Sequence, residues 1–184
     1  TALDATNNTN SIVISTSYNP HTFQVLSTIT VNNGFVKLTI ARPFDGFHEL
    51  YYDPAGTGSY TTPHISSATN NWTAGLYMKD GRERDWNAFA DSHCTVDIED
   101  HSSVANQHCN VTIRIEGALQ TMYQWISPSI RYSMRISIPN APPMVKCQLA
   151  TTFMENVSKV VRNLTFNLPL NNNAYLFSGG IDTA

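Results

Sequence analysis

The stretch IRYSMRISIPNAPPMVKCQLATTF, from Ile130 to Phe153, decides the predicted fold. From Ile130 to Ile138, apolar and polar side chains alternate with a period of two, which is typical of a strand with one buried face. The run of residues 139–143, PNAPP, predicts a turn, because proline cannot donate a hydrogen bond to a neighbouring strand. Met144 to Phe153 alternates again, so we expect an antiparallel hairpin.

The second strand of this hairpin also has one apolar side. Val145, Cys147, Leu149 and Phe153 share that side, and polar residues such as Lys146 lie opposite. A hairpin with one apolar face needs more sheet to cover it. We therefore expect this hairpin to pack against further strands.

A second hairpin is predicted between Thr22–Asn32 and Phe35–Ile40. Asn33-Gly34 lies between them, and Asn-Gly favours a tight hairpin turn because both residues accept positive φ. The other expected strands are 12–17, 48–52, 75–78, 94–99, 109–117, 119–125, 159–170 and 175–177.

No segment has the 3.6-residue period of a helix, and many short strands separated by turns predict an all-β fold. We expect one antiparallel β-sandwich domain over residues 1–184, a length that fits a single domain. Residues 1–10 are expected to form a loose N-terminal arm, and residues 41–92 a loop-rich excursion with long loops in the first half of the chain.

The composition indicates a secreted, extracellular chain. Charged residues make up 14%, against roughly 25% in an average soluble protein, and Asn, Ser and Thr replace them. The net charge of −3 favours neither nucleic acid nor acidic lipid as a partner. No apolar run approaches the ~18 residues of a membrane span, so we expect none. Because no signal peptide stands at Thr1, we expect a mature or trimmed chain.

Five sites fit the N-glycosylation pattern Asn-x-Ser/Thr. Asn110 and Asn163 fall at the start of a predicted strand or on its outward side, where a glycan would meet water. The five sites are Asn7, Asn71, Asn110, Asn156 and Asn163.

The three cysteines suggest one disulfide. Cys94 and Cys109 flank a predicted strand, loop and strand, so a bond between them is expected in an oxidising compartment. Cys147 is then a buried free thiol; the alternative is that Cys147 pairs and another cysteine is free. His93 and His108 directly precede the first two cysteines.

A zinc site built from these two histidines and two cysteines is the alternative to the disulfide, but their spacing matches no standard zinc module. We therefore expect neither a metal nor a cofactor.

The segment KDGRERDW, Lys79 to Trp86, is the densest charged patch. One interpretation is a sugar-binding loop, in which Arg82 or Arg84 pairs with a carboxylate and Trp86 stacks on a sugar ring. The alternative is a solvated turn at residues 80–81 with Trp86 anchoring the loop to the core.

Two further groups of residues are candidates for carbohydrate contact. Arg131 and Arg135 lie on the polar side of the central hairpin, where a groove on the sheet would bind acidic sugars; the alternative is a solvated sheet face. Trp72 belongs to the aromatic residues of the loop-rich excursion, and loops often carry function.

A general base is a third possibility within the excursion. His48, Glu49, Tyr51, Tyr52 and His64 carry suitable groups. No nucleophile elbow, phosphate-binding loop or paired-carboxylate motif accompanies them, so a structural role is the alternative.

The segment from Val111 to Leu170 shows an ordered series of strand patterns: RIEG, RYSMRISI, a proline-marked turn, PxVKCQLATTF and finally Leu-Pro-Leu. This series resembles the N-terminal β-domain of exo-acting, rhamnogalacturonan lyase-type pectin-degrading enzymes, and more loosely the β-sandwich domains of polysaccharide lyases. The resemblance implies a domain attached to an α/α-toroid catalytic domain. Because this chain has no helical periodicity, the resemblance implies an accessory or carbohydrate-binding β-domain, and it assigns no catalytic residue.

Three functions follow as hypotheses. The first is a secreted, glycosylated β-sandwich that contacts polysaccharide or glycan without catalysis. The second is a structural subunit of an extracellular filament, coat or surface layer, which would form a homo-oligomer or polymer, with the N-terminal arm pairing with a neighbour's sheet edge. The third is a small polysaccharide lyase or hydrolase that uses Tyr, His and Arg from residues 48–93.

Overall fold

The computed structural model describes residues 12–18, 26–66, 75–100, 110–121, 130–140, 144–154 and 161–168. Every regular element in this part of the chain is a strand. The strands are β1 (Val13–Tyr18), β2 (Leu26–Asn32), β3 (Val36–Ala41), β4 (Glu49–Tyr52), β5 (Ile65–Ser66), β6 (Gly75–Asp80), β7 (Asp85–Asn87), β8 (Thr95–Asp100), β9 (Asn110–Ala118), β10 (Gln120–Thr121), β11 (Ile130–Pro139), β12 (Lys146–Phe153) and β13 (Val161–Asn167).

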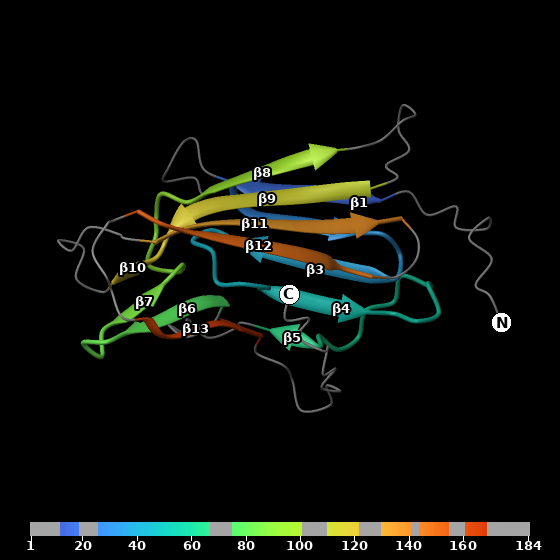
Figure 1. Cartoon of the computed structure of the whole chain (residues 1–184). Coiled ribbons are helices and arrows are strands. Elements are labelled where there is room, and N and C mark those ends of the chain that lie inside the picture. The colour runs from blue at the N-terminus through green and yellow to red at the C-terminus, as the bar shows by residue number, and fades with distance from the viewer. Residues whose placement is uncertain are drawn as a thin grey trace, which may run out of the picture.

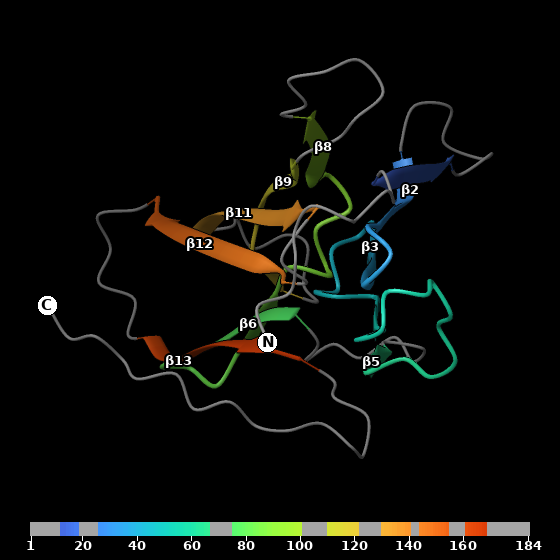
Figure 2. The same ribbon diagram turned by 90° about the vertical axis from the view of Figure 1, so that its right-hand side faces the viewer.

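The strands form three antiparallel sheets, in the orders β1-β2-β3-β4-β5 (sheet A), β10-β7-β6-β13 (sheet B) and β12-β11-β9-β8 (sheet C). In Figure 1, sheet C lies in front of sheet A, and sheet B closes the lower side. Figure 2 shows sheets A and C as two layers. The predicted all-β, antiparallel sandwich is therefore confirmed. No helix long and apolar enough to cross a membrane occurs in the described ranges.

The central hairpin forms as predicted, because β11 and β12 pair antiparallel from Ile130 opposite Phe153 to Ser137 opposite Lys146. The alternation in β11 is also confirmed. All five apolar side chains from Ile130 to Ile138 are almost completely buried, and both arginines of the strand are exposed. β11 is an inner strand of sheet C, paired with β9 on its other side.

The apolar side of β12 is not covered in the way that the pattern predicts. The register places Cys147, Leu149 and Phe153 on the same side as the buried residues of β11. All three are nevertheless exposed, Leu149 by 43% and Phe153 by 55%. The reason is that β12 is the edge strand of its sheet, so only β11 lies beside it.

The predicted hairpin around Asn33-Gly34 is confirmed as β2 and β3, which pair antiparallel. The turn differs in detail from the expected one, because only Gly34 takes a positive φ, of 88°. Asn33 closes the turn with its side chain instead: its Oδ1 accepts hydrogen bonds from the backbone N–H groups of Phe35 (3.0 Å) and Val36 (2.7 Å).

One hydrophobic core draws on all three sheets, and includes Leu38 of β3, Trp86 of β7 and Ile136 of β11. Two polar or backbone contacts hold the sheets together around it. Asn33 Nδ2 donates to the carbonyl of Pro139, which ties sheet A to sheet C (2.8 Å). Gly46 and Gly75 pack backbone against backbone, and a methyl group on either would lie within 2.8 Å of the other.

Candidate functional site

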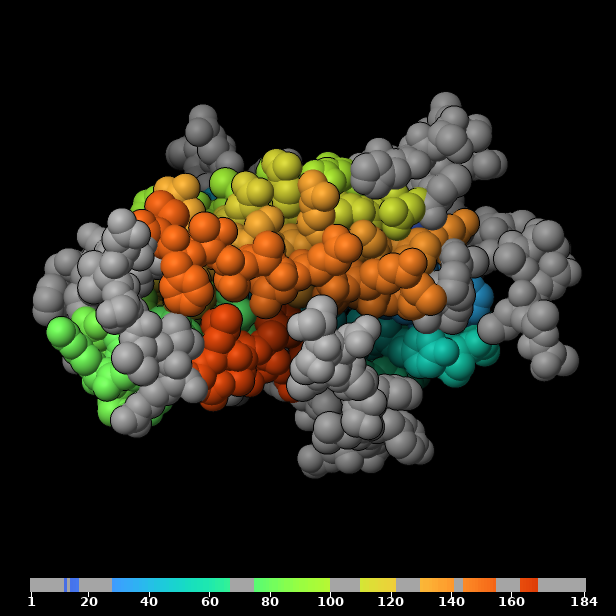
Figure 3. All heavy atoms as spheres, viewed as in Figure 1, coloured from blue at the N-terminus to red at the C-terminus, as the bar shows by residue number. Residues whose placement is uncertain are grey.

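A groove of about 550 Å³ lies on the outer face of sheet C. Figure 3 shows this face of the molecule, with β11 and β12 in orange. The residues that line the groove are Asp91, His93, Thr95, Glu116, Gly117, Ala118, Gln120, Arg131, Tyr132, Ser133, Ala150 and Thr152.

The strand register explains how distant segments meet in this groove. Arg131 of β11 lies between Ala118 of β9 and Thr152 of β12, and Glu116 lies opposite Ser133. Directly opposite residues of an antiparallel pair share one face, so these side chains all project from the outer side of the sheet. The polar side of four neighbouring strands thereby forms one continuous lining.

Asp91 holds one end of the groove in place. This residue lies in the loop between β7 and β8 and is only 4% exposed. Its Oδ2 accepts a hydrogen bond from the backbone N–H of Ala118 (2.8 Å), and its Oδ1 accepts one from the backbone N–H of His93 (2.9 Å). The bond to Ala118 fixes the loop against the end of β9.

Gly117 makes this arrangement possible. It lies opposite Tyr132 in the register, and a Cβ at this position would lie 2.6 Å from the Tyr132 hydroxyl oxygen and 2.7 Å from Asp91 Oδ2. Any larger residue would therefore push these two oxygens apart. Burial raises the pKa of Tyr132, so this side chain stays a neutral phenol at the floor of the groove.

Arg131 is the cation that remains available in the groove. The residue is exposed, and its side chain makes no ion pair or hydrogen bond with the part of the chain that the structure describes. Glu116 is also largely exposed, and its contact with Arg114 is long, at 3.8 Å. An anionic ligand that meets Arg131 therefore does not have to displace a carboxylate from it.

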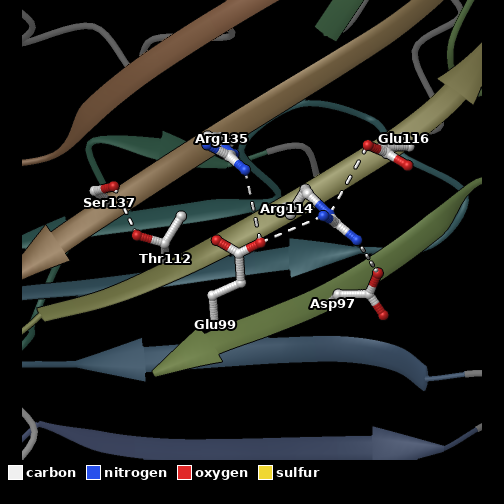
Figure 4. A network of polar contacts seen from close by, with 7 residues as sticks. All are labelled: Asp97, Glu99, Thr112, Arg114, Glu116, Arg135 and Ser137. Atoms are coloured by element: carbon white, nitrogen blue, oxygen red, sulfur yellow. Dashed lines mark hydrogen bonds and ion pairs between the residues drawn. The ribbon is translucent and has the colours of Figure 1, made fainter. Parts of the chain in front are cut away.

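Arg135 has a different environment, although it lies on the same face of β11. Its Nη2 lies 3.8 Å from Glu99 Oε1. Figure 4 shows that Glu99 is shared with Arg114, which also faces Asp97 at 3.5 Å. Arg135 therefore belongs to an ion-pair network with Glu99 and Arg114. This environment fits a solvated sheet face, the alternative considered from the sequence, better than a sugar-binding groove.

The predicted sugar-binding loop at residues 79–86 has the alternative structure that the sequence allowed. Trp86 is completely buried and cannot stack on a ligand; its Nε1 donates to Asp80 Oδ2 (3.1 Å). Arg84 is engaged too, with its Nε 2.7 Å from the same oxygen. Arg82 is exposed and contributes only its backbone N–H to the turn, and Trp72 lies outside the described residues.

None of the candidates for a general base lines the groove. His48 Nδ1 lies 2.7 Å from Asp45 Oδ2. Tyr51 packs edge-on against Tyr60 and under the ammonium group of Lys37, at 4.9 Å. These contacts are structural, and they fall on sheet A rather than at the groove.

Tyr52 and His64 likewise contact each other on sheet A, with 6.3 Å between their ring centroids. Glu49 lies in β4 of the same sheet, opposite Thr39 of β3. Of the histidines considered from the sequence, His93 is the one that lines the groove.

The two described cysteines, Cys94 and Cys147, form no disulfide with each other. Burial raises the pKa of the Cys94 thiol. The predicted partner Cys109 and its neighbour His108 lie outside the described residues, so the disulfide stays a prediction. Cys147 was expected to be buried, but it is exposed on the edge strand.

No group of three or more His, Cys, Asp or Glu side chains is placed to hold a metal ion in the described ranges. Of the five glycosylation sites, the structure describes two. Asn163 is exposed on β13, and Asn110 is half-buried at the start of β9. Asn7, Asn71 and Asn156 lie outside the described residues.

Sequence reasoning singled out Arg131 for carbohydrate contact and considered His93 only as a zinc ligand; it missed Asp91, Glu116 and Gln120. The missed residues are brought in by pairing between β9 and β11 and by a hydrogen bond across 27 positions. The one usable signal was the alternation in β9, which places Glu116 on an outward position.

Comparison with known proteins adds no assignment: no protein family, no curated protein and no solved structure matches this chain. The resemblance to the lyase-type β-domain therefore stays a prediction.

Proposed function

We propose that this chain is a secreted, glycosylated, non-catalytic β-sandwich module that binds an acidic polysaccharide across the outer face of sheet C. The groove that supports this proposal contains one unpaired guanidinium, from Arg131, among uncharged hydrogen-bonding side chains such as Ser133, Thr152 and Gln120. A guanidinium forms two parallel hydrogen bonds with a carboxylate, which is the charged group of a uronic acid. The neutral side chains match the hydroxyl groups of the same sugar.

The single observation that carries the proposal is the contrast between the two arginines of β11. Arg135 has an ion-pair partner in Glu99, at 3.8 Å, whereas no carboxylate of the described residues pairs with Arg131. The lining also includes the carboxylates of the exposed Glu116 and the buried Asp91. Glu116 accepts hydrogen bonds from sugar hydroxyls, but the two carboxylates repel a dense polyanion. A polysaccharide with spaced carboxylates therefore suits the groove better than a highly sulfated one.

The lining offers no exposed aromatic ring, since Tyr132 is 2% exposed. Binding therefore relies on hydrogen bonds and one ion pair rather than on stacking. Such binding is weak for each site and becomes weaker as salt is added.

Affinity electrophoresis in gels containing polygalacturonate, alginate or a neutral glucan tests the proposal. We expect retardation by the acidic polymers only, lost in Arg131→Ala and partly kept in Arg131→Lys. Arg82→Ala, which removes an exposed arginine far from the groove in sequence, is the matched control and should be retarded like the wild type. No retardation of the wild type by any polymer, or equal retardation of Arg131→Ala, would refute the proposal.

A second candidate function is a subunit of an extracellular assembly. The observation that favours it is the exposed apolar edge of sheet C at β12. Sedimentation at several concentrations distinguishes the candidates, because a discrete monomer or dimer that binds acidic polysaccharide excludes an open-ended assembly.

Secretion and glycosylation form part of the main proposal. Expression in a eukaryotic secretory host, followed by enzymatic removal of N-glycans, should lower the mass of the chain. A peptide map should show modified Asn163, the more exposed of the two described sites. An unmodified chain would remove this part of the proposal.

A further inference from the structure

The two edges of sheet C differ in how they are protected from pairing with another strand. A free edge presents unpaired backbone groups, and monomeric proteins commonly protect it with charged side chains. β8, at one edge, carries Asp97 and Glu99, which join the ion-pair network. β12, at the other edge, carries one charged residue in eight, Lys146 at its beginning.

β12 is also exposed on both faces, which is unusual for a strand of this length. Seven of its eight residues are exposed and the remaining one is half-buried. On the inner face, Leu149 and Phe153 lie open beside the core, and Met154 follows with 47% exposure. The strand thus combines an unpaired edge with an uncovered apolar face, in the part of the chain that the structure describes.

The neighbouring strand of sheet B does not close this opening. β13 is the edge of its own sheet, and its Leu164 is 37% exposed on the side that also carries Phe166. β12 and β13 face the viewer together in Figure 1, but the turned view of Figure 2 shows them diverging. A further strand beside β12 would pair with its free edge, and its side chains would pack beside the exposed apolar side chains.

We propose that this strand is β12 of a second copy of the chain, paired antiparallel across a two-fold axis, so that the two sheets C join into one continuous sheet. In a two-fold interface the same surface meets itself, so each side chain must tolerate its own kind nearby. β12 fulfils this condition, because the apolar inner faces of the two copies would lie side by side in the joined sheet.

The charges support a second copy over a different partner. With the axis at Leu149 or Ala150, the two Lys146 side chains lie about 20 to 27 Å apart along the strands, at opposite ends of the interface. They are therefore separated by two Debye lengths or more at physiological salt. Because Lys146 is the one charged residue of β12, a different, charged strand would gain at most one ion pair from it.

The pairing has a consequence for the groove, and this consequence alone rests on the proposed function. Ala150 and Thr152 line the groove from the outer face of β12. The partner's groove would therefore continue on the same sheet face, with two copies of Arg131 related by the axis. A long acidic polysaccharide that contacts both grooves binds more tightly than one that contacts a single groove.

Sedimentation velocity of the full chain without glycan tests the pairing. We expect a species of twice the chain mass of 20.4 kDa. The dimer fraction should rise with protein concentration between about 1 and 100 μM, as it does for a weak dimer. Leu149→Lys should return it to a monomer, because the new charges face each other or nearly so across the axis. Leu168→Lys, which changes an exposed apolar residue outside β12, is the control and should dimerise.

Circular dichroism must show the same β spectrum for both variants, since Leu149 and Leu168 are both exposed and neither lysine disturbs the core. A wild-type chain that remains monomeric at 100 μM, or a dimer that is unchanged by Leu149→Lys, would overturn the proposal.

Cysteine scanning locates the axis. In a Cys109→Ser, Cys147→Ser background, the one native cysteine left is the buried Cys94. An introduced cysteine then cross-links under mild oxidation only where its two copies lie opposite each other. We expect a fast cross-linked dimer for Leu149→Cys or Ala150→Cys, but not for Thr95→Cys on β8. Cross-linking at β8 and not at β12 would overturn the proposal. Loss of glycan binding with the dimer intact would count against the proposed function only.

Discussion

Replacing Asp80 by Asn tests how the buried turn between β6 and β7 is held. Asp80 is 2% exposed, and its Oδ2 accepts hydrogen bonds from Arg84 Nε (2.7 Å) and Trp86 Nε1 (3.1 Å). Its Oδ1 accepts two more, from the backbone N–H groups of Arg82 (2.8 Å) and Arg84 (3.0 Å). Asn has the same shape but no charge and only one carbonyl oxygen.

The magnitude follows from the pKa and from the lost acceptor. Burial alone would raise the pKa of Asp80, but the hydrogen bonds from Arg84 and Trp86 outweigh it and lower the pKa from 3.8 to about 2. One pKa unit corresponds to about 1.4 kcal/mol, so the ionised carboxylate contributes about 2 kcal/mol at neutral pH. Leaving a buried donor without an acceptor costs about 1 to 3 kcal/mol more. We expect Asp80→Asn to lower the free energy of unfolding by about 3 to 5 kcal/mol.

The pH dependence separates the charge from the lost acceptor. Because the pKa of Asp80 is lower in the folded state, its charge stabilises fully above pH 3.8, and this stabilisation disappears as the pH falls towards 2. The difference in unfolding free energy between the wild type and Asp80→Asn should therefore shrink by about 2 kcal/mol between pH 5 and pH 2.

Urea unfolding, followed by tryptophan fluorescence and circular dichroism, measures this difference at each pH. Asp97→Asn is the control, because that side chain is 56% exposed and 3.5 Å from Arg114, and exposed pairs contribute at most about 1 kcal/mol. A difference for Asp80→Asn below about 1 kcal/mol, or one that does not change with pH, would refute the reasoning about the buried pair.

Three further predictions concern glycines and thiols. Gly75→Ala should cost at least about 2 kcal/mol in thermal or urea unfolding, because its φ is +72° and the new methyl would lie 2.7 Å from the backbone N of Gly46. Gly117→Ala should cost about 1 to 3 kcal/mol in the same assay, since two buried side-chain oxygens lie within 2.7 Å of the new methyl. In reducing buffer, alkylation mapped by mass spectrometry should modify Cys147 in the folded protein and Cys94 only after unfolding, because Cys147 is exposed on the edge strand and Cys94 is buried.

The period-two pattern was enough to predict the sandwich, because it reports which side of a strand is apolar. In β11 that side is buried, as expected. The same pattern failed for β12, where Leu149 points inward but stays 43% exposed. Alternation gives the direction of a side chain; coverage depends on which strand ends the sheet, and that follows from pairing between segments far apart in the chain.

The site was less predictable for a related reason. Trp86 and Arg84 occur in a charged, glycine-containing segment that looks solvated, and only the buried Asp80 carboxylate turns them inward. Asp91 reaches the groove through a bond to Ala118, which no local pattern encodes. Sequence reasoning therefore found the exposed cation of the groove but not the residues that shape it.

Arg131 and Arg135 show why the outer face of sheet C has one binding end. They lie four residues apart on the same side of β11, about 13 Å along the strand, so alternation treats them alike. β8 supplies the difference, because its Glu99 approaches Arg135 across β9 and no described carboxylate reaches Arg131 in the same way. The charge that a polysaccharide would meet on this face therefore depends on how far the acidic residues of β8 extend along the sheet. Shifting an acidic residue along β8 towards Thr95 should close the groove to anions without touching the arginine.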